Sequence, residues 1–128
     1  MNSNYKVEII ESSRDFSARE RIAIKDITNA IKFDRAVTDD PYSNLVITPS
    51  DWAVLKIHNE SAEKKDYEVY VIIDGEGKKY YTSSLAFWNS FVEIAEEMKE
   101  EPFSIEVYKV ESRNYKGKYF ITCSIVME

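Results

Sequence analysis

The order of predicted elements within residues 52–126 constrains the fold more than any other feature of the chain. Alternating apolar and polar residues are typical of strands, whereas apolar residues at three- and four-residue spacing are typical of an amphipathic helix. The alternation predicts strands at residues 52–59, 67–74, 78–82, 103–110 and 119–126. Residues 85–99, between the third and fourth strands, have the helical spacing. Three strands, one helix and two strands are the order expected of a small five-stranded barrel.

Turn-forming residues support the pairing of these strands. Asp74-Gly75-Glu76-Gly77 is a tight-turn sequence, so the strands on either side of it should pair antiparallel. The last two strands are joined by residues 112–118, in which Asn114 and Gly117 allow a left-handed backbone. Pro102 stops the helix, and the hydroxyl residues before position 85 offer N-caps.

The N-terminal third of the chain has a weaker pattern. Residues 5–10 and 21–27 alternate and predict two strands, whereas residues 28–37 suit either the end of a long hairpin or a short helix. Residues 38–44 are rich in turn formers and mark the best internal boundary. We therefore expect residues 1–44 to form an N-terminal β-hairpin extension packed on a barrel formed by residues 45–128.

Length and composition agree with one compact, mainly β domain. The chain has 128 residues, of which 44% are hydrophobic, enough to form a packed core. No apolar run is long enough to span a membrane, and no secretory signal is visible at the N-terminus. The single cysteine, Cys123, cannot form an intrachain disulfide. A cytoplasmic location is the expectation.

Catalysis, metal binding and cofactor binding have little support. The only histidine, His58, has a strand phase that places it beside Lys56 on the outer face, where a solvated or ligand-contacting role is favoured over general-base chemistry. Cys123 alternates with Ile121 and Ile125, as a buried small hydrophobe would. Neither metal-ligand spacing nor a glycine-rich phosphate loop is present. The sequence therefore predicts a protein that is not an enzyme and that holds no cofactor.

Charge is unevenly distributed along the chain. The net charge of −6 argues against non-specific binding to duplex DNA. It leaves single-strand binding open, because stacking on aromatic rings supplies about 1–3 kcal/mol per base. Residues 85–101 hold five glutamates and one lysine, whereas residues 103–126 hold four basic and two acidic residues. We expect an acidic helix and a basic hairpin on different sides of the molecule.

Aromatic and basic residues together form the candidate site. Rings that stack on bases and cations that contact phosphates are what single-strand binding requires. The candidates are Trp52, Lys56, Tyr70, Lys79, Tyr81, Arg113, Tyr115, Lys116 and Lys118. Strand phase places the first three on the face opposite the predicted core. The competing interpretation is that the tyrosines reflect β-propensity, the lysines keep the loop soluble, and the N-terminal hairpin covers the first three residues.

Several segments resemble phage and mobile-element single-stranded DNA-binding proteins. They are residues 66–71, the turn at 74–77, residues 79–84 followed by Phe87, Phe91 and Ile94, and the hairpin at 112–120. The resemblance covers about two-thirds of the chain. It implies an OB-fold, a five-stranded Greek-key barrel, that coats single strands during replication or recombination. Such proteins are often homo-oligomers, and replication or recombination proteins are their expected partners.

Two functions follow as expectations. The first is non-enzymatic binding of single-stranded DNA, or of RNA, with no membrane partner. The alternative is a protein-interaction module, a phage or mobile-element factor that adapts or inhibits a host protein. In that case its acidic helix, with Glu93, Glu96, Glu97, Glu100 and Glu101, would dock a basic partner. An enzyme that uses tyrosine and glutamate residues is a weaker third interpretation.

Overall fold

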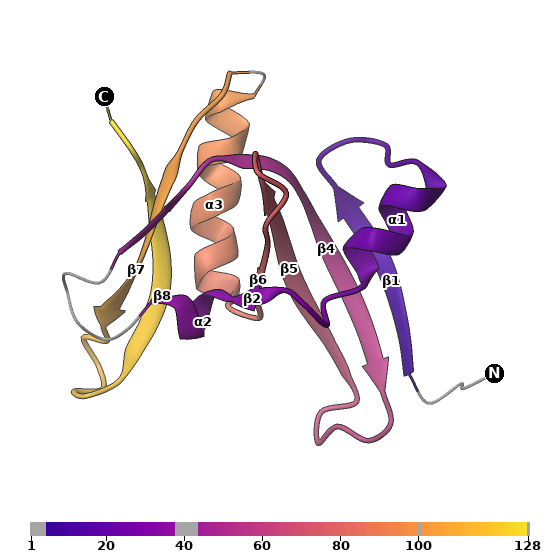
Figure 1. Cartoon of the computed structure of the whole chain (residues 1–128). Helices are drawn as coiled ribbons and strands as arrows, with labels where there is room; N and C mark the ends of the chain where they lie inside the picture. The colour runs from indigo at the N-terminus through magenta and orange to yellow at the C-terminus, as the bar shows by residue number, and fades with distance from the viewer. Residues whose placement is uncertain (1–4, 38–43, 100, 128) are drawn as a thin grey trace.

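The computed structural model describes residues 5–37, 44–99 and 101–127, and it is mainly β. Two sheets pack on either side of one long helix, α3 (Leu85–Met98) (Figure 1). The five-stranded sheet has the order β1 (Tyr5–Ser12), β4 (Pro49–Asn59), β5 (Asp66–Asp74), β6 (Lys79–Thr82) and β2 (Ile31–Lys32). The three-stranded sheet has the order β3 (Leu45–Ile47), β7 (Ile105–Glu111) and β8 (Tyr119–Ile125). The two shorter helices are α1 (Ala18–Lys25) and α2 (Phe33–Ala36).

A single bend carries the chain from one sheet to the other. β3 and β4 are consecutive and are separated only by Thr48, whose carbonyl oxygen accepts a hydrogen bond from the Gly75 amide at 3.0 Å. The predicted turn at residues 74–77 is confirmed, because Asp74 Oδ1 accepts hydrogen bonds from the amides of Glu76 and Lys78, each at 2.9 Å. β5 and β6 pair antiparallel across it, as predicted.

The predicted five-stranded barrel is not confirmed, because neither sheet closes on itself. Closure would require β6 to pair with β8, and among the described residues no such pairing exists. The free edge of β6 pairs instead with β2, which runs parallel to it. Helix α3 lies beside β8, where the hydroxyls of Ser90 and Thr122 are 3.4 Å apart. The expected mainly β class with one long helix is confirmed, and the strands form two separate sheets.

Helix α3 follows its predicted pattern closely. Ser84 is the N-cap, and its hydroxyl accepts a hydrogen bond from the Phe87 amide at 3.2 Å. Trp88, Phe91 and Ala95 are buried, as the three- and four-residue spacing predicts. The buried stripe begins two residues after the start of the helix. Leu85 is 59% exposed, and Phe87 is fully buried in its place.

The predicted N-terminal hairpin is wrong in its second strand. β1 is present and pairs antiparallel with β4, but residues 18–25 form helix α1 where a strand was expected. A capping box explains the helix, because the Ser17 hydroxyl accepts from the Glu20 amide while the Glu20 carboxylate accepts from the Ser17 amide at 2.8 Å. The ambiguous residues 28–37 divide between β2 and the single turn of α2. Most of the predicted turn-rich boundary, residues 38–43, lies outside the described residues.

Both faces of the central strands β4 and β5 are buried, in two separate cores. On one face, Leu55 and Val71 pack with Ile24 of α1. On the other face, Val54 and Ile72 pack with α3 and the three-stranded sheet. Phe33 and Val37 from the N-terminal segment belong to this second core, so residues before position 44 are part of the packed structure.

The predicted burial of the single cysteine is also confirmed. Cys123 is buried at 5% exposure, as predicted, and burial raises the pKa of its thiol to about 12. Within the described part of the chain, no helix has the length and apolar character needed to cross a membrane.

Candidate nucleic-acid interface

The nine predicted site residues do not form one surface. Trp52 and Tyr70 lie on the face of the sheet that α3 covers, where the Tyr70 ring is buried and the Trp52 ring is half-buried. Trp52 meets Phe91 edge-on, with ring centroids 5.2 Å apart. Tyr70 is only 6% exposed and stacks on Trp88, with ring centroids 5.0 Å apart and planes 11° apart. In this structure Tyr70 presents no free ring face on which a base could stack.

Lys79 and Tyr81 point to the opposite face, toward α1. The Lys79 ammonium donates to the carbonyl oxygens of Ala23 and Asp26, at 2.6 Å for Asp26, and so satisfies carbonyls at the C-terminus of α1. Burial lowers the pKa of Lys79. Tyr81 is half-buried against the core beneath α1. Both side chains therefore hold the N-terminal segment on the sheet.

Lys56 is exposed, but it lies among charges of both signs. Glu8 of β1 and Glu68 of β5 are its direct cross-strand neighbours. Two residues further along β4, the protonated His58 ring donates hydrogen bonds to the carboxylates of Asp66 and Glu60, each at 2.8 Å. These bonds, Asp66 first, raise the pKa of His58. A surface of alternating charges does not provide the continuous positive potential that a phosphate backbone requires.

The β7–β8 loop is where predicted site residues do come together. Arg113, Tyr115, Lys116 and Lys118 are all exposed on this loop. Its backbone is fixed by hydrogen bonds from the Ser112 amide to the Lys118 carbonyl at 2.8 Å and from the Lys118 amide to the Tyr115 carbonyl at 3.1 Å. Gly117 has φ +83° and its amide donates to the Glu111 carboxylate at 3.0 Å, so glycine's left-handed backbone is used here.

Within this loop a cation and a ring are already paired. The Lys118 ammonium lies over the Tyr115 ring, 5.5 Å from its centroid, and the Tyr115 side chain is 63% exposed. One face of the ring is therefore next to a positive charge while most of its surface is accessible to solvent. This is the combination of stacking surface and phosphate contact on which single-strand binding depends.

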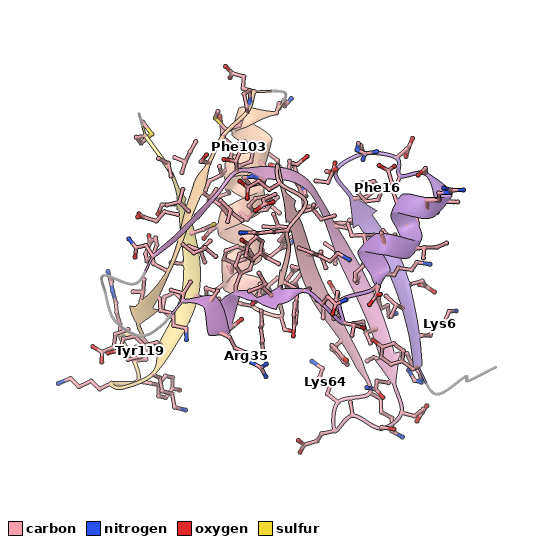
Figure 2. All side chains as sticks on the ribbon, in the orientation of Figure 1. Lys6, Phe16, Arg35, Lys64, Phe103 and Tyr119 are labelled. Carbon is pink, nitrogen blue, oxygen red and sulfur yellow. The ribbon has the colours of Figure 1, made fainter. Side chains whose placement is uncertain are left out.

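Three further residues lie at the same end of the molecule as the β7–β8 loop and were not predicted as site residues. Tyr119 and Phe120, directly after the loop, are 41% and 43% exposed. Arg35 of α2 lies at the same end of the molecule as Tyr119 (Figure 2). Packing explains this placement, because α2 is held against the first turn of α3 by Phe33 and Phe87, whose ring centroids are 4.9 Å apart. Two adjacent aromatic residues after a basic loop were the signal in the sequence.

We call this surface the basic end. It consists of Arg35, Arg113, Tyr115, Lys116, Lys118, Tyr119 and Phe120. The β4–β5 loop, with Lys64 labelled, reaches the same side of the molecule in Figure 2. That loop carries both charges, since Lys65 pairs with Glu60 at 3.1 Å.

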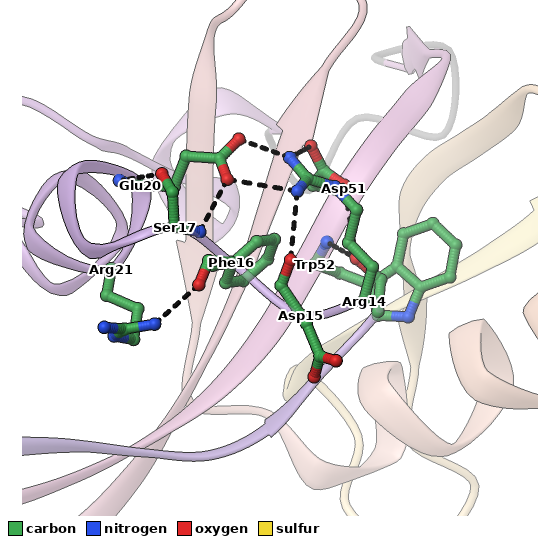
Figure 3. Close-up of polar contacts among 9 residues, drawn as sticks. Arg14, Asp15, Phe16, Ser17, Glu20, Arg21, Asp51 and Trp52 are labelled. Atoms are coloured by element: carbon green, nitrogen blue, oxygen red, sulfur yellow. Dashed lines mark hydrogen bonds and ion pairs between the residues drawn. The ribbon is translucent and has the colours of Figure 1, made fainter.

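A second polar cluster, near the start of α1, is structural (Figure 3). Arg14 bridges Asp51 at 2.9 Å and Glu20 at 2.5 Å, and Glu20 also accepts from the Ser17 amide. The Arg14 guanidinium, together with that amide, holds the pKa of Glu20 at about 2. Because these charges satisfy one another, the cluster ties α1 to β4 and leaves no group free for chemistry.

Among the described residues, no set of three or more histidine, cysteine, aspartate or glutamate side chains is arranged to hold a metal ion. Comparison of the chain with protein-family models, with curated proteins and with solved structures finds no match.

Proposed function

We propose that this protein binds single-stranded nucleic acid through the basic end. The observation that carries the proposal is the β7–β8 loop, where four predicted contact residues are exposed together and Lys118 lies over the Tyr115 ring. Bases would stack on Tyr115, Tyr119 or Phe120, and the cations of the basic end would contact phosphates. The surface is smaller than the sequence suggested, because Trp52 and Tyr70 are packed against α3.

The path of the strands supports the same proposal. If β3 and β4 are counted as one bent strand, the order β6-β5-β4/β3-β7-β8 is a curved path of five strands that stops short of closure. OB-folds are partly open five-stranded barrels, and the loops between their first two and last two strands bind oligonucleotides. The corresponding loops here are β4–β5 and β7–β8, and both reach the same side of the molecule (Figure 1). We therefore propose an open relative of that architecture.

Direct titration tests the proposal. Fluorescence anisotropy of a labelled oligo-dT of about 30 nucleotides should show saturable binding that weakens steeply with salt. Duplex of the same length should bind much more weakly. Absence of binding to the single strand at low salt would overturn the proposal, and equal binding to duplex would overturn its specificity. Oligo-U of the same length decides between DNA and RNA.

A second candidate is a protein-interaction module docked through α3. It is favoured by Glu93, Glu96 and Glu97, which are exposed and form no ion pair with any other described residue. Glu100, also predicted for this surface, lies outside the described residues. Under this candidate, reversing the α3 glutamates abolishes partner binding, whereas variants of the β7–β8 loop retain it.

A further inference from the structure

A groove of about 250 Å³ opens between the five-stranded sheet and α3. Its lining comes from three elements that are distant in sequence. β1 and the residues after it contribute Glu11, Ser12 and Ser13; β4 contributes Trp52, Ala53 and Val54; α3 contributes Trp88, Val92, Ala95 and Glu96. Because Glu96 lies in the last turns of α3 and Glu11 at the C-terminal end of β1, the groove extends away from the basic end (Figure 1).

The only two tryptophans of the chain line this groove, and both are held rigidly. Trp88 stacks on Tyr70 and on Phe91, with centroid separations of 5.0 Å and 5.1 Å. Trp52 is fixed edge-on by Phe91 and by Phe103. Neither indole N–H donates a hydrogen bond to another described residue. Trp88 is only 6% exposed within this stack, so the ring available to an occupant is that of the half-buried Trp52. A tryptophan ring is the strongest cation–π partner among the aromatic side chains.

Two carboxylates stand beside the tryptophans. Glu11 and Glu96 are exposed, and within the described residues neither forms an ion pair. Glu20, by contrast, is compensated by Arg14. The Glu11 charge is close enough to the aromatic stack that, after burial and Glu68, it contributes to the raised pKa of Tyr70. The groove therefore combines aromatic walls with uncompensated negative charge.

This lining selects the chemistry of its occupant. A phosphate would be repelled by the two carboxylates, and a neutral apolar group would desolvate them without pairing them. A guanidinium satisfies both features, because its planar face stacks on aromatic rings while its N–H fork pairs with carboxylates. We propose that the groove is a docking site for an arginine side chain of a partner protein.

The size of the groove and the surface around it favour a protein segment over a free small molecule. Pockets for small molecules usually measure about 300–1,000 Å³, and this groove is smaller. A second hollow of about 480 Å³ begins on the other side of Glu96, with Ile94, Met98 and Ile125 among its lining residues and Glu93 and Glu97 beside them. Residues flanking the docked arginine would contact this second hollow. The inference rests on the protein-interaction candidate and is independent of nucleic-acid binding.

The two indole N–H signals in a ¹H–¹⁵N correlation spectrum report directly on the groove, since both tryptophans line it. The probe is a pentapeptide with one arginine between glycines and with blocked ends, and its control carries citrulline, the neutral isostere, in place of arginine. The arginine peptide should shift both indole signals saturably, and the citrulline peptide should not. The variant Glu11→Gln/Glu96→Gln should weaken binding by about tenfold or more, the cost of losing one charge-assisted hydrogen bond.

A matched variant separates the groove from general acidity. Glu63→Gln/Glu76→Gln removes the same charge from exposed loop positions that line neither hollow, and it should leave the peptide affinity within about twofold, as expected for screened surface charges. Equal loss in both variants would overturn the groove, because it would show attraction to overall negative charge. Absence of a shift, or an equal shift with citrulline, would overturn the proposal. Equally tight binding of free arginine amide would overturn its assignment to a protein segment.

Discussion

Tyr70 stacks on Trp88 with ring centroids 5.0 Å apart and an angle of 11° between the ring planes. This contact joins β5 of the five-stranded sheet to α3 and lies in the larger of the two cores. It also explains why the candidate interface is confined to one end of the molecule. The helix covers the sheet face on which Trp52 and Tyr70 were expected to contact bases.

Removing the ring of Trp88 should be costly. Trp88→Ala should lower the free energy of unfolding by about 3–5 kcal/mol, because it deletes a buried aromatic side chain and leaves a cavity between α3 and the sheet. Tyr70→Phe keeps its ring, and the Tyr70 hydroxyl forms no hydrogen bond with another described residue, so the loss should stay below about 1 kcal/mol. Urea denaturation measures both. Weaker oligo-dT binding by Tyr70→Phe, at unchanged stability, would show that the Tyr70 hydroxyl contributes to nucleic-acid binding.

The capping box should be the main local determinant of α1. Ser17→Ala removes the hydroxyl that accepts from the Glu20 amide and should lower the free energy of unfolding by about 1 kcal/mol. Ser83→Ala is the matched control, because Ser83 is exposed and lies just before the N-cap of α3; it should change stability by less than about 0.5 kcal/mol. Equal effects of the two substitutions would contradict the capping role.

His58 should titrate above its ordinary pKa of 6.5, because Asp66 and then Glu60 hydrogen-bond to its ring. A raised folded-state pKa means that the protonated ring favours folding. This contribution is fully present below pH 6.5 and is lost as pH rises through the folded-state pKa. The single imidazole signal in a ¹H NMR titration measures the pKa directly, and Asp66→Asn should lower it. A wild-type pKa at or below 6.5 would contradict the observed hydrogen bonds.

Cys123 should be unreactive while the protein is folded. Burial raises the pKa of its thiol to about 12, and only the thiolate is an effective nucleophile. Labelling with a thiol-specific disulfide reagent at pH 8 should be slow in buffer and complete within minutes in denaturant. Fast labelling of the native protein, at a rate independent of added denaturant, would show that β8 exposes the thiol.

The parts of the fold that were predictable have strong local periodicity. Helix α3 and the strands from β4 to β8 follow it, and the turn at Asp74 uses the residues that its hydrogen bonds require. Helix α1 was missed because Ile22 and Ile24 lie two apart, as in a strand. Only Ile24 is buried, whereas Ile22 is 72% exposed. The Ser17-to-Glu20 capping spacing was the better signal, since an eight-residue helix depends on its caps more than on its apolar face.

The candidate site was only partly predictable, because strand phase says which side chains share a face and not what covers that face. Trp52 and Lys56 do share a face, but α3 covers only Trp52. The nearly continuous apolar run at residues 69–73 was a warning, since such runs are typical of strands buried on both faces. Closure of the barrel would require long-range pairing between β6 and β8. Local sequence patterns carry no information about such pairing.

The most direct test compares single-strand affinity across matched charge variants. Arg113→Gln/Lys116→Gln/Lys118→Gln neutralises the β7–β8 loop, and Lys6→Gln/Arg19→Gln/Lys78→Gln removes the same charge from exposed positions elsewhere. Anisotropy titrations with oligo-dT at several salt concentrations should show that the loop variant binds weakly. The slope of log K against log salt should be shallower by about 2, as expected for three lost phosphate contacts. The control should bind like wild type. Wild-type affinity in the loop variant, or equal losses in both variants, would contradict the proposed interface.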